Sequence, residues 1–336
     1  MTILRAVACL LLATHAEAQT LLFRSGFEPD MSLQAVTQAD CWSGGCRQYF
    51  EPGRADQSTG FTWPPTIWGG STAGFLLLAD TATDAASIHE QMFNQIVTVT
   101  GHDGTPTRAL YSQVTRSGCC GMDPQGSGAT QGDFGIEPAS EPAGVAGDLY
   151  LSYWLKLQDG LEKLMQVGNP VGGWYWRSPF EWKTAGDYRV TVHIRRDPAV
   201  SGGALFWRLI GDNEANGGLP YKIFWNVVNT SVAVPVGEWF KFEVFWHRSL
   251  GSDGRVWVAI QCVGQPREVI FDRFGSNMGS PNPSDAEYGF PDSPRPINRI
   301  LLPLYSGTAY PVYQWIDDLE IRTGIPSTDP RSAQRP

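Results

Sequence analysis

The chain has 336 residues, of which 18% are charged, and it contains 13 Trp, 11 Tyr and 16 Phe. This apolar and aromatic content can bury enough surface to offset chain entropy, which excludes a disordered chain. With 37 Gly, 24 Pro and few charges, a coiled coil or helical bundle is also excluded. The net charge of −9 argues against a nucleic-acid partner, because phosphates would be repelled.

Residues 1–18 have the pattern of a secretory signal peptide. Arg5 precedes an apolar stretch, Ala6–Thr14, and Ala16-Glu17-Ala18 offers small residues at the cleavage positions. The stretch is too short to span a membrane, and no later segment is apolar enough to do so. A buried N-terminal strand or helix is the alternative. We therefore expect a secreted protein, extracellular or periplasmic, whose mature chain begins at Gln19.

Beyond the signal peptide, the sequence predicts short β-strands separated by turns rich in Gly, Asn, Asp and Pro. Residues 31–70 and 117–147 are expected to be loops, and His89 fits a short helix. Aromatic and β-branched residues alternate with period two in most of the predicted strands. These are 21–23, 108–115, 149–157, 180–183, 188–195, 205–210, 221–227, 239–247, 256–261 and 314–321. The pattern predicts an antiparallel β-sandwich in one domain, residues 19–323, followed by a disordered tail, residues 324–336.

Five cysteines remain after the signal peptide: Cys41, Cys46, Cys119, Cys120 and Cys262. An odd number in a secreted protein predicts one free or intermolecular thiol. Cys41 and Cys46 flank a small flexible loop and can form a disulfide. Cys119 and Cys120 can pair with each other, or one of them with Cys262. The spacing does not match a zinc site.

Strand periodicity places polar and cationic side chains on the outward faces of the predicted strands. The outward residues are Arg189, Thr191, His193 and Arg195; Lys241, Glu243, Phe245 and His247; and Glu181 and Lys183. Such a face suits an acidic polysaccharide, because aromatic rings stack on sugars and Arg or Lys binds carboxylates. The alternative is an ordinary solvated face with cross-strand ion pairs such as Glu181–Arg189.

The first and last strands carry a resemblance to a known group of proteins. The segments SGFE (25–28) and WIDDLEI (315–321), together with YLSYWLKL (150–157), FEWKTAGDYRV (180–190) and GEWFKFEVFWHRSLGSDGRVWVAI (237–260), resemble concanavalin A-like jelly rolls. Among these, the similarity is to secreted polysaccharide lyases of the heparin, alginate and glucuronan type, and to related glucanases. It covers most of residues 21–323 and implies a sandwich of two antiparallel sheets.

The resemblance also implies a structural calcium ion near the first and last strands. Transferred to this chain, Glu28 and Asp317 would be its ligands, helped by backbone carbonyl groups, since calcium prefers oxygen. Asp317 has the parity of Leu319 and Ile321, so we expect it to face the interior. The alternative is that Asp317 is hydrogen-bonded to the backbone without a metal. No other cofactor is implied.

The family's catalytic patterns are matched only in part. Thr191-Val192-His193 is similar to the Gln-(Ile/Val)-His strand of alginate lyases, with Thr in place of Gln. By this resemblance His193 is the candidate base and Tyr310 or Tyr313 the candidate acid. The candidate cations that neutralise a substrate carboxylate are Arg195 and Arg108, with Lys183 as a secondary one. The Glu-x-Asp-x-x-Glu motif of glucanases is absent, which counts against hydrolysis.

Two hypotheses follow. The first is a secreted lyase that cleaves an acidic, uronate-containing polysaccharide by β-elimination. The second is a non-catalytic carbohydrate-binding protein on the same scaffold. The distinguishing feature is whether His193, Arg195 and a tyrosine converge in one groove.

Overall fold

The computed structural model describes fifteen segments of the chain. These are residues 20–42, 45–46, 48–51, 53–63, 66–67, 71–72, 92–115, 128–135, 148–166, 175–184, 189–212, 223–247, 254–274, 297–307 and 311–325. The predicted signal peptide, most of the predicted tail, His89, Cys119, Cys120 and Tyr310 lie outside these residues, so the predictions made for them stay predictions.

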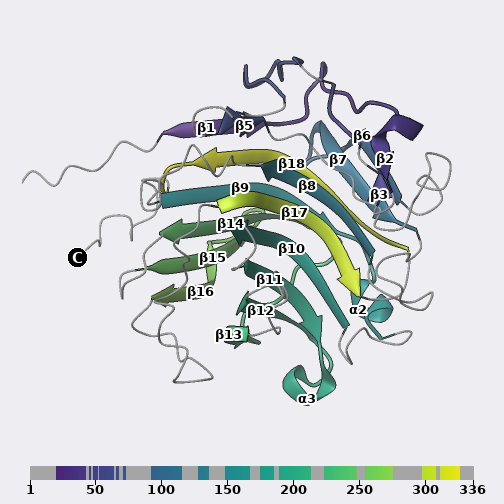
Figure 1. Ribbon diagram of the computed structural model, residues 1–336. Coiled ribbons are helices and arrows are strands. Elements are labelled where there is room, and N and C mark those ends of the chain that lie inside the picture. The colour runs from purple at the N-terminus through teal and green to yellow at the C-terminus, as the bar shows by residue number, and fades with distance from the viewer. Residues whose placement is uncertain are drawn as a thin grey trace, which may run out of the picture.

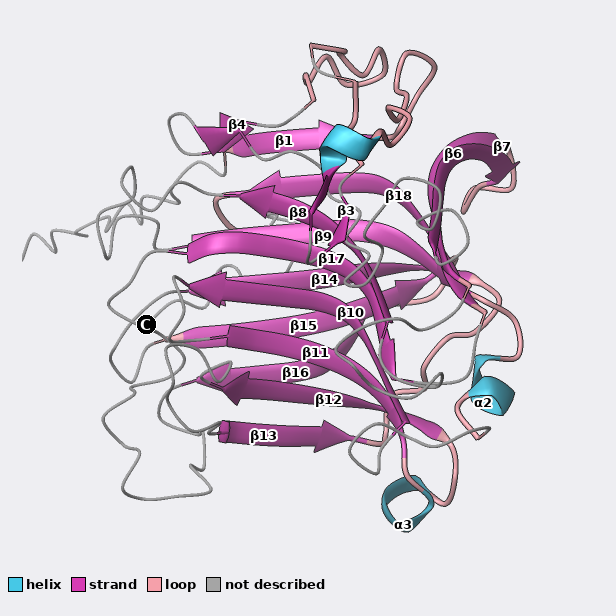
Figure 2. Cartoon of the chain, turned by 45° about the vertical axis from the view of Figure 1, so that its right-hand side comes forward, coloured by secondary structure: helices cyan, strands magenta, loops and turns pink. Residues whose placement is uncertain are grey.

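Two antiparallel sheets stack as layers (Figures 1 and 2). The eight-stranded sheet has the order β16-β15-β14-β9-β18-β7-β6, with β1 paired to β18. Its strands are β1 (Leu21–Ser25), β6 (Met92–Thr100), β7 (Pro106–Val114), β9 (Asp148–Leu157), β14 (Trp239–His247), β15 (Arg255–Cys262), β16 (Glu268–Phe274) and β18 (Val312–Arg322). The six-stranded sheet has the order β13-β12-β11-β10-β17-β8. Its strands are β8 (Gly128–Gly135), β10 (Tyr175–Thr184), β11 (Arg189–Arg196), β12 (Leu205–Asp212), β13 (Ile223–Asn229) and β17 (Ile297–Gly307).

The remaining elements are short. They are η1 (Gln38–Asp40), the hairpins β2 (Cys41–Trp42) with β3 (Gly45–Cys46) and β4 (Thr66–Ile67) with β5 (Ser71–Thr72), α2 (Leu161–Leu164) and α3 (Pro198–Ser201). No helix in the described part of the chain is long and apolar enough to cross a membrane. The fold is thus an all-β jelly-roll sandwich, as predicted, although β8 lies where the sequence predicted a loop.

The core lies between the sheets and follows from strand alternation. In β14, the predicted inward residues Phe240, Phe242, Val244 and Trp246 are all buried. Phe240, Phe242 and Trp246 contact rings of the facing sheet, with Trp182 and Trp246 centred 4.1 Å apart. Aromatic side chains therefore fill this interface, which confirms the inward half of the predicted pattern.

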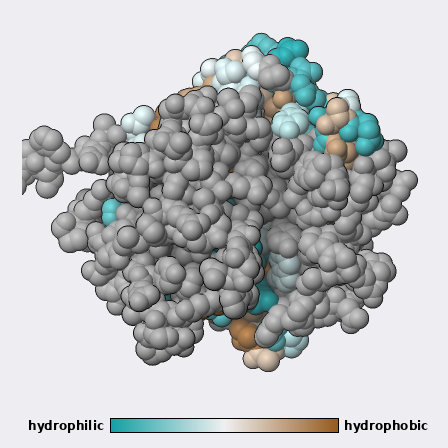
Figure 3. Space-filling model, viewed as in Figure 1, coloured by the Kyte–Doolittle hydropathy of each residue, from teal (hydrophilic) through white to brown (hydrophobic). Residues whose placement is uncertain are grey.

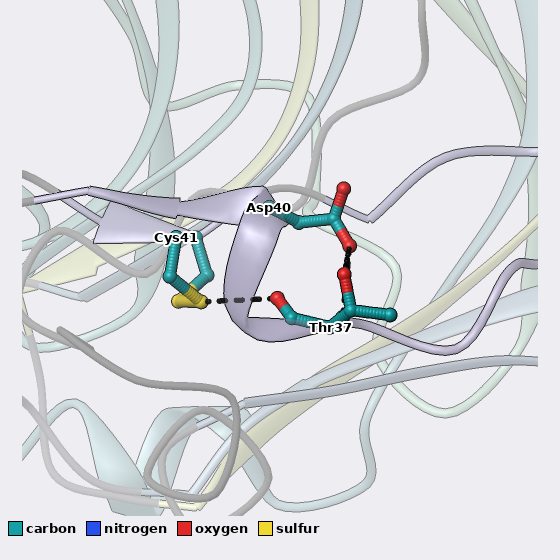
Figure 4. Close-up of a disulfide and its surroundings, with 4 residues drawn as sticks. Thr37, Asp40 and Cys41 are labelled. Carbon is teal, nitrogen blue, oxygen red and sulfur yellow. Dashed lines mark hydrogen bonds between the residues drawn. A yellow bond between two sulfur atoms is a disulfide. The ribbon is translucent and has the colours of Figure 1, made fainter.

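The N-terminal segment after β1 builds its own aromatic cluster and joins the main core. Phe50 and Trp63 stack with ring centres 4.0 Å apart, and Phe27 stacks on both. A disulfide joins Cys41 and Cys46, as the sequence allowed, and Cys46 is fully buried. Figure 4 shows this disulfide beside η1, where Thr37 and Asp40 form a capping box. In the space-filling view, hydrophilic residues gather along the top edge, over this N-terminal segment (Figure 3).

The outer face of the eight-stranded sheet carries a second, smaller apolar cluster. Tyr150, Phe245, Trp257 and Ala259 pack there against Ile325. The outward residues of β14 thus lie on the outer face of the eight-stranded sheet, whereas those of β11 lie on the outer face of the six-stranded sheet. The two outward faces predicted from these strands consequently lie on opposite sides of the sandwich and do not form one surface.

Candidate active site

His193 lies on the outward face of β11, in the six-stranded sheet, as its parity predicts. Its Nδ1 is 2.8 Å from the Ser178 hydroxyl of the neighbouring strand β10. The Trp176 ring lies nearly perpendicular to the imidazole of His193, with the two ring centres 5.7 Å apart. The imidazole is therefore held on one nitrogen, and Nε2 is the nitrogen left for chemistry.

A β-bulge in β10 places Ser178 beside His193. The register between β10 and β11 shifts between Arg177 and Phe180, so Ser178 faces outward while Arg177 faces the core. Arg177 is fully buried and its Nη2 donates to Gln314 Oε1 of β18, 2.6 Å away in the other sheet. Burial lowers the pKa of Arg177 to about 9. Its Nε and Nη1 have no hydrogen-bond partner within the described segments.

The surroundings of His193 disfavour its protonated form. Burial lowers the pKa of His193 well below its usual value, and the positive charges of Arg208 and Arg189 lower it further. Arg208 of β12 is directly opposite His193 in the register, and its Nε donates to Asn226 Oδ1 at 2.6 Å. A neutral imidazole at neutral pH can accept a proton, which a general base must do.

The carboxylates on this face are bound to arginine. Arg189 forms a bidentate pair with Asp212, with both N–O distances 2.9 Å, and lies 3.9 Å from Glu181. Glu181 and Asp212 are buried. The ion pair Glu181–Arg189, predicted as the alternative reading of this face, is thus present. Two carboxylates held in this way are poor candidates for the acid and base of a hydrolase.

Only some of the predicted catalytic residues come together. Arg195 shares the outward face of β11 with His193. The residue Lys183 pairs with Arg189, so it belongs to the same sheet. Tyr313 and Arg108 lie on β18 and β7 of the other sheet, so the structure does not bring them to His193.

The two misplaced residues have other contacts. Tyr313 contacts Tyr111 and Trp315, and Arg108 donates to the carbonyl groups of Pro29 and Met31. Sequence reasoning had no means to separate the sheets, because strand pairing between distant segments leaves no local signal. It also missed Arg208, which alternates with the core residues Trp207 and Leu209 as an outward position would.

A separate pocket of about 260 Å³ contains the two predicted calcium ligands, Glu28 and Asp317. The Thr107 hydroxyl lies 3.1 Å from Asp317 Oδ2 and 3.4 Å from Glu28 Oε1. Burial, together with the charges of Asp318 and Glu28, raises the pKa of Asp317 to about 7. Phe27 and Asp318, which flank the two ligands, adopt positive φ angles of 56° and 46°.

Asp317 is buried, but it does not share the inner face of Leu319 and Ile321 as expected. Its Oδ1 accepts a hydrogen bond from the backbone N–H of Asp318 at 2.7 Å. The register of β18 shifts between Asp317 and Glu320, so parity with Leu319 is lost and Asp317 contacts Thr107 on the outer side. The donor set is all oxygen, which fits calcium. No group of three or more His, Cys, Asp or Glu arranged around a metal position is found within the described segments, so backbone oxygens would have to complete the shell.

No protein-family model matches the sequence. No curated protein matches it either. Among solved structures, an alginate lyase with bound alginate trisaccharide is similar at 14% identity and a TM-score of 0.39, over 77% of this chain and 96% of its own. An alginate lyase from Aplysia kurodai is similar at 10% identity and a TM-score of 0.40, over 67% of this chain and 86% of its own. A glucuronan lyase from Trichoderma reesei is similar at 10% identity and a TM-score of 0.40, over 68% of this chain and 86% of its own. These three neighbours are alginate and glucuronan lyases. At these identities the likeness assigns this chain neither a substrate nor an activity.

Proposed function

We propose that the protein cleaves an acidic, uronate-containing polysaccharide by β-elimination, with His193 as the base. The observation that carries the proposal is an imidazole, held by Ser178, on a sheet face that also bears Arg195 and Arg208. The positive charges of Arg195 and Arg208 would attract an anionic sugar. A non-catalytic carbohydrate-binding protein would need the arginines but not the oriented imidazole.

The reaction has to remove the weakly acidic C5 proton of the uronate. Pairing of the substrate carboxylate with Arg195 or Arg208 stabilises the charge that develops when this proton leaves. His193 Nε2 accepts the proton, the bond from C4 to the bridging oxygen breaks, and a C4–C5 double bond forms. The bridging oxygen takes a proton from an acid and leaves as the hydroxyl group of the departing chain.

A tyrosine is our candidate for this acid. Tyr310, which lies outside the described residues, stays a candidate. Tyr305 is a second one, because it pairs with Ser178 in the register between β17 and β10. Tyr305→Phe and Tyr310→Phe separate the two, since the variant that lacks the acid should lose most of its turnover while substrate binding persists.

The proposal is tested by comparing His193→Ala with Ser178→Ala on a panel of polyuronates. His193→Ala should abolish formation of unsaturated uronate. Ser178→Ala should retain reduced activity, because the base remains but its orientation is lost. Equal activity of wild type and His193→Ala would overturn the assignment.

We further propose that the Glu28–Asp317 pocket binds a structural calcium ion and that the protein is exported. A bound cation would offset the repulsion between the buried Asp317 and the nearby carboxylates of Asp318 and Glu28. The Cys41–Cys46 disulfide is typical of oxidising compartments. Calcium should raise the melting temperature of chelator-treated wild type but not of Glu28→Gln. An unchanged wild-type melting temperature would contradict the calcium site.

A further inference from the structure

A group of partly exposed aromatic side chains lies on the outer face of the eight-stranded sheet, on the opposite side of the sandwich from His193. It consists of Phe93 (β6), Tyr111 (β7), and Tyr313 and Trp315 (β18). Ring centres are 5.3 to 6.1 Å apart between neighbours. Phe93 is 40% exposed, and the other three are partly exposed. We refer to these four rings as the aromatic surface.

The rings are aligned across the strands by the hydrogen-bond register. Trp315 is directly opposite Tyr111 on one side and Lys156 of β9 on the other. In the adjacent row, Tyr313 is opposite Gln113, which in turn is opposite Phe93. Together with Lys156, the aromatic surface therefore extends over four strands, perpendicular to their direction. An ammonium group and a side-chain amide lie among its rings.

Polar side chains lie among the rings and indicate what kind of ligand the aromatic surface can bind. Lys156 Nζ lies 5.6 Å from the centre of the Trp315 ring, and the Tyr111 hydroxyl donates to Gln113 Oε1. A flexible ammonium in a weak contact with a ring can move to a carboxylate at little cost. Rings that stack on sugars and a cation that binds a carboxylate together match an acidic glycan better than an apolar protein surface.

We propose that the aromatic surface is a second binding site for the acidic polysaccharide, distinct from the His193 face. A chain held there would keep the protein on its polymer between encounters at the other face, since a second contact raises the effective concentration of substrate. The inference rests on the proposed substrate class but not on catalysis by His193.

The test uses the mature chain with His193→Ala, so that polymer is bound and not consumed, labelled with 5-fluorotryptophan. Trp315→Phe identifies the ¹⁹F resonance of Trp315, and the buried Trp63 of the N-terminal cluster serves as the internal control. Addition of an oligouronate should shift the Trp315 resonance and leave that of Trp63 in place. A Trp315 resonance that moves no more than the Trp63 resonance would overturn the proposal.

Affinity gives a second, independent measurement. Tyr111→Ala and Trp315→Ala should each weaken retention on an immobilised polyuronate by about tenfold, since an aromatic contact and its buried area contribute on this scale. The exposed Val263, in the turn after β15, provides the control variant Val263→Ala, which should bind as the parent does. Lys156→Gln should weaken binding of polyuronate more than of a neutral glucan. Equal loss on both polymers would refute the acidic specificity, and parental affinity in both aromatic variants would refute the site.

Failure of this inference is distinguishable from failure of the proposed function. Lyase activity is measured with wild type by formation of unsaturated uronate, whereas these experiments detect binding by a chain that lacks the base. Loss of the Trp315 response with intact lyase activity would remove only the second site.

Discussion

Glu243 offers the sharpest test of how the outer face of the eight-stranded sheet is stabilised. Its side chain is fully buried and accepts from Arg267 Nε at 2.7 Å, from Arg267 Nη2 at 2.9 Å and from the Tyr150 hydroxyl at 2.5 Å. Glu243→Gln keeps the shape but removes the negative charge with which Arg267 pairs. Removing one partner of a buried pair costs about 3–5 kcal/mol. Because the Arg267 side chain is 22% exposed, water compensates in part, and we expect a loss near the lower end, about 3 kcal/mol.

The assay is urea unfolding at neutral pH, with tryptophan fluorescence as the signal and the midpoint and slope compared between variants. The double variant Glu243→Gln with Arg267→Gln removes both charges of the pair, so its loss should be smaller than the sum of the two single losses. A single-variant loss under about 1 kcal/mol, or strict additivity in the double variant, would refute the reasoning, since exposed pairs contribute no more than that.

The remaining predictions concern the candidate active site. Because the pKa of His193 in the folded protein lies below its ordinary value of 6.5, the unfolded chain takes up this proton first, so stability should fall as pH drops below about 6.5. This fall should be weaker in His193→Gln; an identical pH dependence would contradict it. Arg208→Gln should raise the pKa of His193, measured by NMR titration of the imidazole, and move the acid limb of the activity profile to higher pH; an unmoved titration would show that Arg208 does not act on the base. Arg177→Met with Gln314→Leu replaces a buried charge by apolar groups and should leave stability unchanged or raise it by about 1–4 kcal/mol, whereas a large loss on urea unfolding would show that the charge itself is stabilising.

Much of the strand pattern is readable from the sequence. The predicted strand 239–247 coincides with β14, and its predicted inward residues are buried in the core. In β11, the inward positions Val190, Val192 and Ile194 are buried there too. These segments combine strong alternation with aromatic and β-branched residues, so local preference and burial agree. By contrast, β8 contains three glycines in eight residues and little alternation, and β17 is interrupted by Pro303, so both lack the local signal.

The site was less predictable because it depends on pairing between distant segments. Parity placed His193 and Arg195 on one face, but it could not show that β18 and β7 belong to the other sheet, which separates Tyr313 and Arg108 from them. Bulges are equally silent in sequence. The one in β10 brings Ser178 to His193, and the one in β18 reverses the expected orientation of Asp317.

The central claim is eliminative cleavage of an acidic polysaccharide with His193 as the base. The most direct measurement is ultraviolet absorbance of unsaturated uronate when the mature chain is incubated with alginate, glucuronan, hyaluronan, pectate and heparin. We expect a rise with at least one polymer, and we expect this rise to be lost in His193→Ala. No rise with any polymer, or a rise that His193→Ala retains, would contradict it.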